Sequence, residues 1–292
     1  MSTSDPTART LSATEARLVL DLEWHEEKVI SLARLRVTLG VSYAHARLLA
    51  HKLVKKGWLE RMKPGLYHFI PASRGPQGVP DSNPFLVASL LPKPSFFSFG
   101  TACTHHGFTE QVFAQMYVAC RTTRRPLAIR GKRFVFVQLS APRFFGHQTV
   151  SIFGLPVVMA TPERALLDAL DRPRYAGGIG EVSRMLSRAI PRISWPQLLN
   201  DATRWKQSSL VQRLGYFLDL HQIEIPRRIR ASLRKLLRPG NKVFLGARGQ
   251  WGTSGPLDTS WNVVQNVPRE FLVERDQPSR HRIVFLAQGS RS

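Results

Sequence analysis

The chain has 292 residues, of which 43% are hydrophobic and 21% are charged, a globular composition that excludes a largely disordered protein. Lys and Arg number 42 against 20 Asp and Glu, and the resulting net charge of +22 indicates a polyanionic partner such as nucleic acid. No apolar run approaches the roughly 18–20 residues of a membrane-spanning helix, and the N-terminus lacks a secretory signal, so we expect a cytoplasmic protein with no membrane partner.

Residues 1–11 read as a flexible tail, and three helices are expected after it. The first begins at Ser12, the second covers 32–39 and ends at the turn residue Gly40, and the third begins at the N-cap Ser42 and stops before Gly57. Helical spacing predicts an inward face on the first helix formed by Ala16, Val19, Leu20 and Trp24.

The third helix is amphipathic. Its inward stripe is predicted to be Ala46, Leu49, Ala50, Leu53 and Val54. Its outward face is predicted to carry Tyr43, Ala44, His45, Arg47, Leu48, His51, Lys52 and Lys55.

A two-stranded ribbon is expected next. Residues 58–62 and 66–70 are strand-like, and Lys63-Pro64-Gly65 between them is typical of a turn. Three helices followed by a ribbon are the plan of a winged helix-turn-helix, which we assign to residues 12–71.

The third helix has the chemistry of a DNA-recognition helix, since a helix fits the major groove and its first residues reach base edges. Ser42, Tyr43, His45 and Arg47 are the candidate base contacts. The remaining candidate DNA contacts, mainly to phosphate, are Arg34, Arg36, His51, Lys52, Lys55, Lys56, Arg61 and Lys63. The alternative is a winged helix used only for protein contacts or dimerisation. Independently of this choice, Leu48 on the outward face could pack against the ribbon.

A breaker-rich linker is predicted at 72–83, a larger mixed α/β domain at 84–273 and a polar tail at 274–292, so the fold class is α+β. Strands are expected at 115–119, 133–137, 149–153 and 155–159, with strand-like runs at 242–245 and 261–264. Helices are expected from 84, up to Gly107, from Thr161 and across 181–237 with breaks at prolines. Cys103 and Cys120 read as buried thiols in a reducing compartment.

The second domain contains two blocks without acidic residues, between Glu110 and Glu163 and between Glu224 and Asp258. A second basic surface is therefore expected, although a merely solvated surface is the alternative. Its candidate residues are Arg121, Arg124, Arg125, Arg130, Lys132, Arg133, Arg227, Arg228 and Arg230.

No arrangement of residues indicates an enzyme, and neither a metal nor a cofactor is expected. Adjacent His105 and His106 point in different directions on a helix and lack further ligands nearby. Glu163 and Asp168 are five residues apart, a spacing that favours a helix-capping acid and a surface or arginine-paired acid over a metal-binding pair.

The order of several short motifs, from about residue 12 to 267, resembles the AbiEi antitoxins of type IV toxin–antitoxin systems. The motifs are Gly57-Trp58-Leu59, Gly65-Leu66-Tyr67, Ser98-Phe99-Gly100-Thr101-Ala102, His106-Gly107-Phe108-Thr109, Ala160-Thr161-Pro162-Glu163-Arg164-Ala165-Leu166-Leu167-Asp168, Gly177-Gly178, Leu214-Gly215-Tyr216-Phe217-Leu218 and Trp261-Asn262-Val263-Val264-Gln265-Asn266. The resemblance implies an N-terminal winged helix that represses its own promoter at inverted repeats. It also implies a C-terminal domain that antagonises a nucleotidyltransferase-like toxin, AbiEii, in phage defence.

The sequence therefore predicts a DNA-binding transcriptional autorepressor and antitoxin that is not an enzyme. Two alternatives remain: a protein–protein antitoxin module that does not bind DNA, and a degenerate enzyme acting on nucleic acid.

Overall fold

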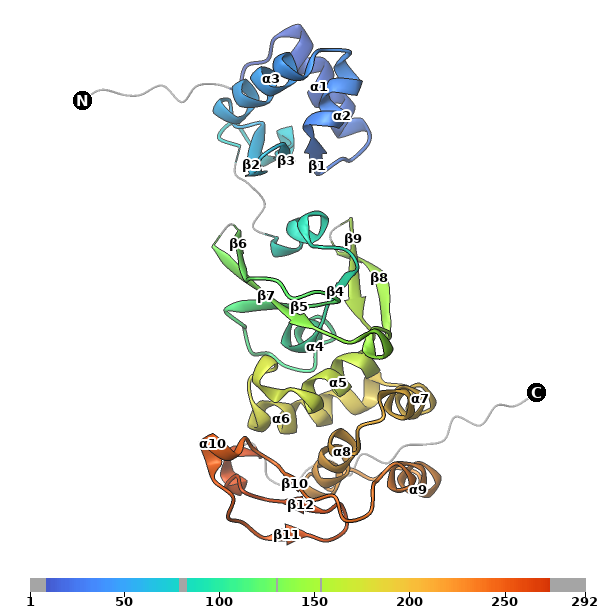
Figure 1. Cartoon of the computed structure of the whole chain (residues 1–292). Coiled ribbons are helices and arrows are strands. Elements are labelled where there is room, and N and C mark those ends of the chain that lie inside the picture. Colours follow the sequence, from blue (N-terminus) through green and yellow to red (C-terminus); the bar gives the residue numbers. More distant parts are fainter. Residues whose placement is uncertain (1–8, 79–82, 130, 153, 274–292) are drawn as a thin grey trace, which may run out of the picture. The chain divides into compact units, whose positions relative to one another are not determined.

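The computed structural model describes residues 9–78, 83–129, 131–152 and 154–273 and shows a mixed α+β protein (Figure 1). The described residues divide into two compact units: one holds those up to Leu91 with those of 128–132 and 151–157, and the other holds the remaining described residues. The tail predicted at 274–292 lies outside the described residues, as do parts of the predicted tail 1–11 and linker 72–83.

Residues 9–78, which we call the N-terminal module, contain three helices and a three-stranded antiparallel sheet of order β1-β3-β2. The predicted helices and ribbon are present, whereas strand β1 was not predicted. The elements are α1 (Ala13–Trp24), β1 (Val29–Ser31), α2 (Leu32–Leu39), α3 (Tyr43–Lys55), β2 (Leu59–Lys63) and β3 (Leu66–Phe69).

A serine begins each helix of the module. The side chains of Ser12, Ser31 and Ser42 accept hydrogen bonds from the backbone three residues further on, and so satisfy N–H groups that the first turn leaves free. Glu15 also accepts a bond of 2.8 Å from the Ser12 backbone N–H, which completes a capping box on α1. Gly40 ends α2 in the left-handed conformation that glycine adopts without strain.

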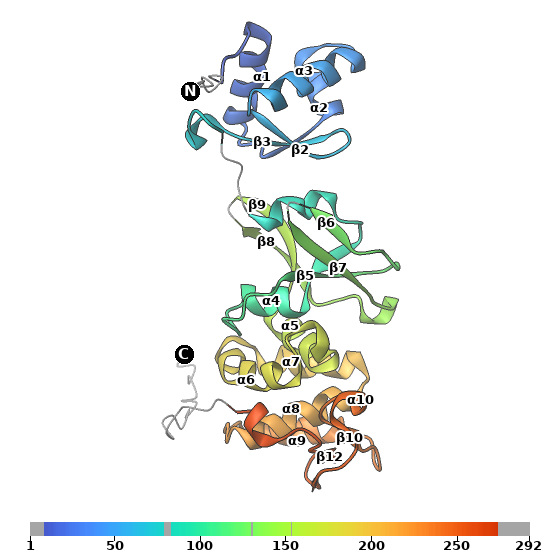
Figure 2. The same cartoon turned by 90° about the vertical axis from the view of Figure 1, so that its left-hand side faces the viewer.

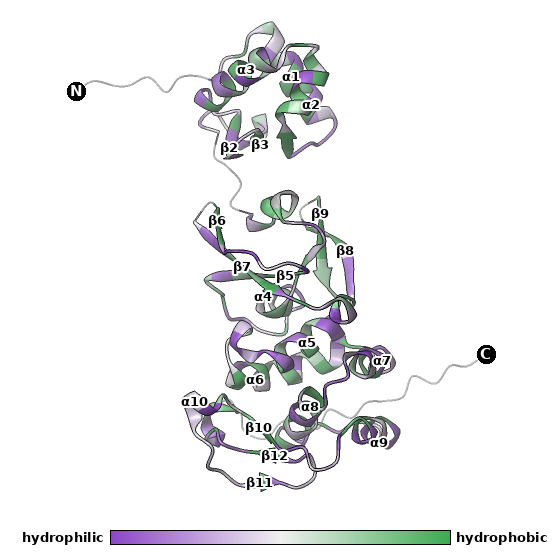
Figure 3. Ribbon diagram, in the orientation of Figure 1, coloured by the Kyte–Doolittle hydropathy of each residue, from purple (hydrophilic) through white to green (hydrophobic). Residues whose placement is uncertain are grey.

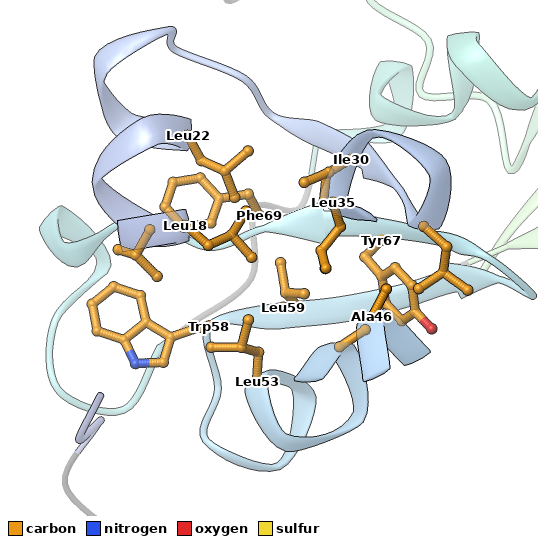
Figure 4. Close-up of a cluster of buried hydrophobic side chains, with 13 residues drawn as sticks. Leu18, Leu22, Ile30, Leu35, Ala46, Leu53, Trp58, Leu59, Tyr67 and Phe69 are labelled. Carbon is orange, nitrogen blue, oxygen red and sulfur yellow. The ribbon is translucent and has the colours of Figure 1, made fainter. Parts of the chain in front are cut away.

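The hydrophobic core of the module is drawn in Figure 4, where side chains from all three helices meet those of β1, β2 and β3. The buried face of α1 consists of Leu18, Val19 and Leu22 together with the capping residue Glu15. The predicted inward face was therefore partly wrong, because Leu20 and Trp24 are 64% and 85% exposed. The prediction followed apolar character, whereas the paired carboxylate of Glu15 takes a place on the buried face.

The larger part of the chain is built on a six-stranded mixed sheet of order β6-β7-β5-β4-β9-β8. Strand β5 pairs parallel to β7 and antiparallel to β4, and β4 pairs parallel to β9. Figure 3 shows the edge strand β8 as largely hydrophilic and its neighbour β9 as largely hydrophobic. The strands are β4 (Ser95–Phe97), β5 (Gln115–Cys120), β6 (Leu127–Ile129), β7 (Lys132–Gln138), β8 (His147–Ile152) and β9 (Leu155–Ala160).

Helix α5 lies among the other helices of this part and packs against α4, α6, α7 and α8 (Figure 2). A small sheet of order β10-β12-β11 follows α9. These elements are α4 (Phe99–His105), α5 (Pro162–Asp171), α6 (Ile179–Ala189), α7 (Trp195–Trp205), α8 (Ser208–Leu220), α9 (Arg227–Lys235), β10 (Val243–Phe244), α10 (Arg248–Trp251), β11 (Leu257–Asp258) and β12 (Val263–Val264). Short 3-10 turns cover Ala72–Arg74, Pro84–Leu90, Ala141–Arg143, Pro173–Tyr175, Ile190–Arg192 and Arg269–Phe271.

One predicted helix is of a different type, and the breaks predicted at Pro196 and Pro226 are confirmed. The helix expected from residue 84 is the 3-10 segment Pro84–Leu90. Pro196 and Pro226 lie at the starts of α7 and α9, where the missing N–H has no helical partner to lose.

A buried ion pair joins two of the sequence motifs. On α5 the guanidinium of Arg164 donates to both carboxylate oxygens of Asp168, at 2.8 and 3.0 Å, and both side chains are inaccessible to solvent. Asp168 also accepts a hydrogen bond from Ser98, and Arg164 donates to the carbonyl oxygens of Arg143 and Phe145. Both charges are thus neutralised by partners within the fold, as burial requires.

Close packing between Gly215 and Trp261 joins a second pair of the sequence motifs. A Cβ atom at position 215 would lie 2.2 Å from the indole ring of Trp261, so only glycine allows α8 to pack against this ring. The Trp261 indole N–H donates to Asp219 of the same helix at 2.7 Å. These motif residues hold the fold together.

Candidate nucleic-acid interface

Helix α3 separates apolar from basic residues. Ala46, Leu49, Ala50 and Leu53 are buried in the core of the module, and Val54 is half-buried. The eight residues predicted for the outward face are all exposed: Tyr43, Ala44, His45, Arg47, Leu48, His51, Lys52 and Lys55. Lys52 and Lys55 lie in the last turn, where their positive charges interact favourably with the negative end of the helix dipole.

A groove of about 750 Å³ lies between α3 and the β2–β3 hairpin. Buried or half-buried Leu32, Val54 and Tyr67 contribute apolar surface, and exposed Arg47, His51 and Arg61 bring basic groups to it. The complete lining is Leu32, Tyr43, Ala44, Arg47, Leu48, His51, Val54, Arg61, Pro64, Gly65 and Tyr67. Sequence periodicity identified the helical side of this groove but not the contributions of Leu32 and Tyr67, which depend on how the hairpin packs.

Six exposed cations of α2, α3 and the hairpin have no partner among the described residues. Across residues 9–78, 83–129, 131–152 and 154–273, no ion pair or side-chain hydrogen bond occupies the charged groups of Arg36, Arg47, Lys52, Lys55, Arg61 and Lys63. All six residues are exposed.

Two predicted phosphate contacts are engaged elsewhere. The guanidinium of Arg34 bonds to Glu27 at 3.0 Å and Asp21 at 3.2 Å, and the Glu27 hydrogen bond raises the arginine pKa. Lys56 bonds to the buried carboxylate of Glu15 at 2.6 Å. Both side chains therefore differ from the six unengaged cations, and their role as DNA contacts stays a prediction.

Two apolar side chains interrupt the basic surface. Tyr43 is 57% exposed and Leu48 is 51% exposed, and both line the groove. Leu48 lines the groove together with Arg61 and Tyr67 of the hairpin, and its packing against the ribbon stays an alternative prediction.

The second set of basic residues is only partly exposed. Arg121, Arg124, Arg125 and Arg133 are exposed, Lys132 is half-buried, and Arg130 lies outside the described residues. On α9, Arg227 and Arg228 are exposed, whereas Arg230 forms an ion pair with Asp219. Thus only part of this set is available to an external partner.

The residues considered for catalysis or metal binding are engaged in the fold. Glu163 accepts a bond of 2.7 Å from the Ser194 N–H, and the Asp168 carboxylate is held by Arg164, as the arginine-paired interpretation predicted. A nitrogen of the His106 ring lies 2.7 Å from the Ala160 carbonyl oxygen. The described residues contain no group of three or more His, Cys, Asp or Glu side chains placed to hold a metal ion. Cys103 and Cys120 are buried and free, as expected.

The described helices include none with both the length and the apolar character required to cross a bilayer.

Comparison with known proteins gives a structural similarity. No family model matches the sequence, and no curated protein matches it. The structure resembles the crystal structure of the RV2827C protein from Mycobacterium tuberculosis, with a TM-score of 0.64 and 18% sequence identity over 88% of this chain and 93% of that chain. At this identity the similarity shows a common fold and nothing about function.

Proposed function

We propose that the N-terminal module is a winged helix-turn-helix that binds double-stranded DNA, with α3 in the major groove and the β2–β3 hairpin as the wing. The observation that carries the proposal is the set of six exposed, unengaged cations on α2, α3 and the hairpin. Cations without internal partners are the groups that can displace counterions from phosphate.

The dimensions of α3 suit this role. Its 13 residues give a helix about 20 Å long, and the major groove, about 12 Å wide, admits a helix. The first two turns carry the exposed Tyr43, His45 and Arg47, which would reach base edges. Lys52, Lys55, Arg61 and Lys63 would contact phosphate on either side.

We further propose that the chain represses its own promoter and acts as an antitoxin of the AbiEi type. The order of sequence motifs, which continues through both parts of the chain, supports this proposal. In this proposal the C-terminal part antagonises a nucleotidyltransferase-like toxin. Co-expression with such a toxin from the neighbouring reading frame should restore growth, and continued growth arrest would contradict the antitoxin role.

DNA binding is tested by selecting duplexes from a random 20-base-pair pool with the full-length protein and measuring affinity by fluorescence anisotropy. We expect a shared sequence to be enriched, and DNA from upstream of the protein's own reading frame to contain it. Failure to bind any duplex would overturn the proposal and would favour the protein–protein module, for which the exposed Tyr43 and Leu48 would be the natural contact residues.

The matched variants are Arg47→Ala and Arg17→Ala. Both remove an exposed arginine from a helix of the same module, but Arg17 lies on α1 and does not line the groove. The proposal requires Arg47→Ala to weaken binding and Arg17→Ala to leave it nearly unchanged. Equal effects of the two substitutions on DNA affinity would contradict the placement of α3 in the major groove of DNA.

A further inference from the structure

The outward face of α3 contains a short apolar stripe that phosphate binding does not explain. Ala44 and Leu48 are four residues apart, so they lie one above the other on the helix, and both are exposed and line the groove. Leu48 is 51% exposed, although the core of the module lies on the opposite face of this helix. A surface that served only to attract phosphate would gain nothing from this side chain.

Arg47 lies beside this stripe and is exposed on the same side of the groove. An arginine is the common bidentate partner of guanine O6 and N7 in the major groove, and apolar side chains contact the C5-methyl group of thymine. The first two turns of a recognition helix are the part that reaches base edges. The stripe and Arg47 fall within these turns.

We infer that Ala44 and Leu48 read thymine C5-methyl groups in the major groove, while Arg47 reads a neighbouring guanine. This inference rests on the proposed DNA-binding function and adds the base class that the helix selects. Residues 44 and 48 are separated by about 6 Å along the helix axis, so the methyl groups that they contact lie on neighbouring base pairs. The preferred site therefore contains at least two thymines within a few base pairs of a guanine.

The surroundings of the stripe favour DNA over an apolar protein partner. The cationic groups of Arg47, Lys52 and Lys55 on the same helix and of Arg61 on the hairpin flank it, and none of them is engaged by the described residues. An apolar protein surface would have to bury these charges without compensation, whereas a DNA backbone neutralises them.

The test uses the full-length protein and a duplex obtained by selection from the random pool. A second duplex of the same sequence carries deoxyuridine in place of thymine, which removes only the C5-methyl groups. Loss of each contacted methyl should weaken binding about fourfold, so two contacts should give about a fifteenfold increase in Kd.

The variant Leu48→Ala identifies the side chain responsible. This variant no longer contacts its thymine methyl group. Replacing thymine by deoxyuridine should therefore raise its Kd only about fourfold, compared with about fifteenfold for the wild type. Leu20→Ala is the matched control, since Leu20 is 64% exposed on α1 of the same module, and it should keep the full penalty. Thermal unfolding of both variants checks that they remain folded, as expected for exposed positions.

The outcomes separate this inference from the function on which it rests. Selective binding that is equally tight to thymine and deoxyuridine duplexes would overturn methyl recognition and leave DNA binding intact. An unchanged penalty in a folded Leu48→Ala variant would overturn the assignment to Leu48. Absence of any DNA binding would overturn the proposed function itself.

Discussion

Arginines on α3 and α5 carry the same charge in opposite surroundings. Arg47 on α3 is exposed and has no partner among the described residues, whereas Arg164 on α5 is fully buried and donates to Asp168 and to two carbonyl groups. The net charge of the chain counts both equally. The difference shows that a basic composition indicates a polyanionic partner only after the internally neutralised residues have been set aside.

Internally neutralised arginines also occur among the residues that follow the N-terminal module. Arg143, Arg184, Arg188 and Arg230 each form an ion pair with an acidic residue, and Arg192 donates to the Gly107 carbonyl. Many arginines there tie segments of the fold together, so this part presents less unpaired charge than its sequence suggests.

The largest effect is expected when the buried arginine is removed. Arg164→Ala leaves the Asp168 carboxylate buried without its counterion and should lower the free energy of unfolding by about 3–5 kcal/mol. Urea unfolding followed by circular dichroism measures the loss. Arg47→Ala is the control and should change stability by less than about 0.5 kcal/mol. Similar losses in both variants would erase the contrast between the two helices.

For DNA affinity, the larger effect is expected from Arg47→Ala rather than from Arg164→Ala. Arg47→Ala should weaken binding to the selected duplex by about 5- to 150-fold, because a bidentate contact to guanine contributes about 1–3 kcal/mol to discrimination. Fluorescence anisotropy at constant salt measures this change. If Arg47→Ala bound as tightly as the wild type, Arg47 would be a solvated surface charge.

Acid should affect the module through Glu15. Burial raises the pKa of this carboxyl, but the hydrogen bonds from Lys56 and Ser12 outweigh burial and hold the pKa below its ordinary value of 4.5. A lowered folded-state pKa gives stability that is present above pH 4.5 and is lost as the pH falls through the folded pKa. Glu15→Gln should therefore cost about 1 kcal/mol at neutral pH and flatten the acid limb of stability against pH. Thermal unfolding between pH 3 and 7 measures this, and an unchanged acid limb would show that Glu15 does not carry it.

The smallest effect of a single substitution is expected for Lys52, through the salt dependence of DNA binding. If the five unengaged cations other than Arg47 contact phosphate, affinity should fall roughly 500-fold between 50 and 200 mM salt. Lys52→Ala should weaken binding to all sequences alike and reduce the slope of log K against log salt by about one. An unchanged slope would place Lys52 outside the phosphate contacts.

The sequence predicted the outward face of α3 correctly because exposure on a single amphipathic helix follows from its own 3.6-residue period. It did not predict the ion pairs of Arg34 and Lys56. Their acidic partners Asp21, Glu27 and Glu15 come from α1 and the loop after it, not from the helix whose period was analysed. The exposed Leu20 and Trp24 were assigned to the core for a related reason. A helical pattern locates a face, and tertiary packing decides which face turns inward.

The short sequence motifs, taken one by one, did not indicate the structural role of their residues. Ser98, Arg164 and Asp168 belong to two separate motifs, and the structure brings them together in one buried network. Gly215 and Trp261 are joined by a close approach in the same way. Contacts between distant segments of this kind leave no periodic signal in the sequence.

The most direct test compares two triple variants that remove equal positive charge from the two regions. Arg47→Ala/Lys52→Ala/Lys55→Ala changes α3, and Arg227→Ala/Arg228→Ala/Lys235→Ala changes the exposed side of α9. The measured quantity is the ratio of affinities for the selected duplex and a shuffled one, expected to be about 10³ or more for the wild type. We predict that the α3 variant loses this ratio and the α9 variant keeps it. An α3 variant that retained the full ratio would contradict the placement of α3 in the major groove.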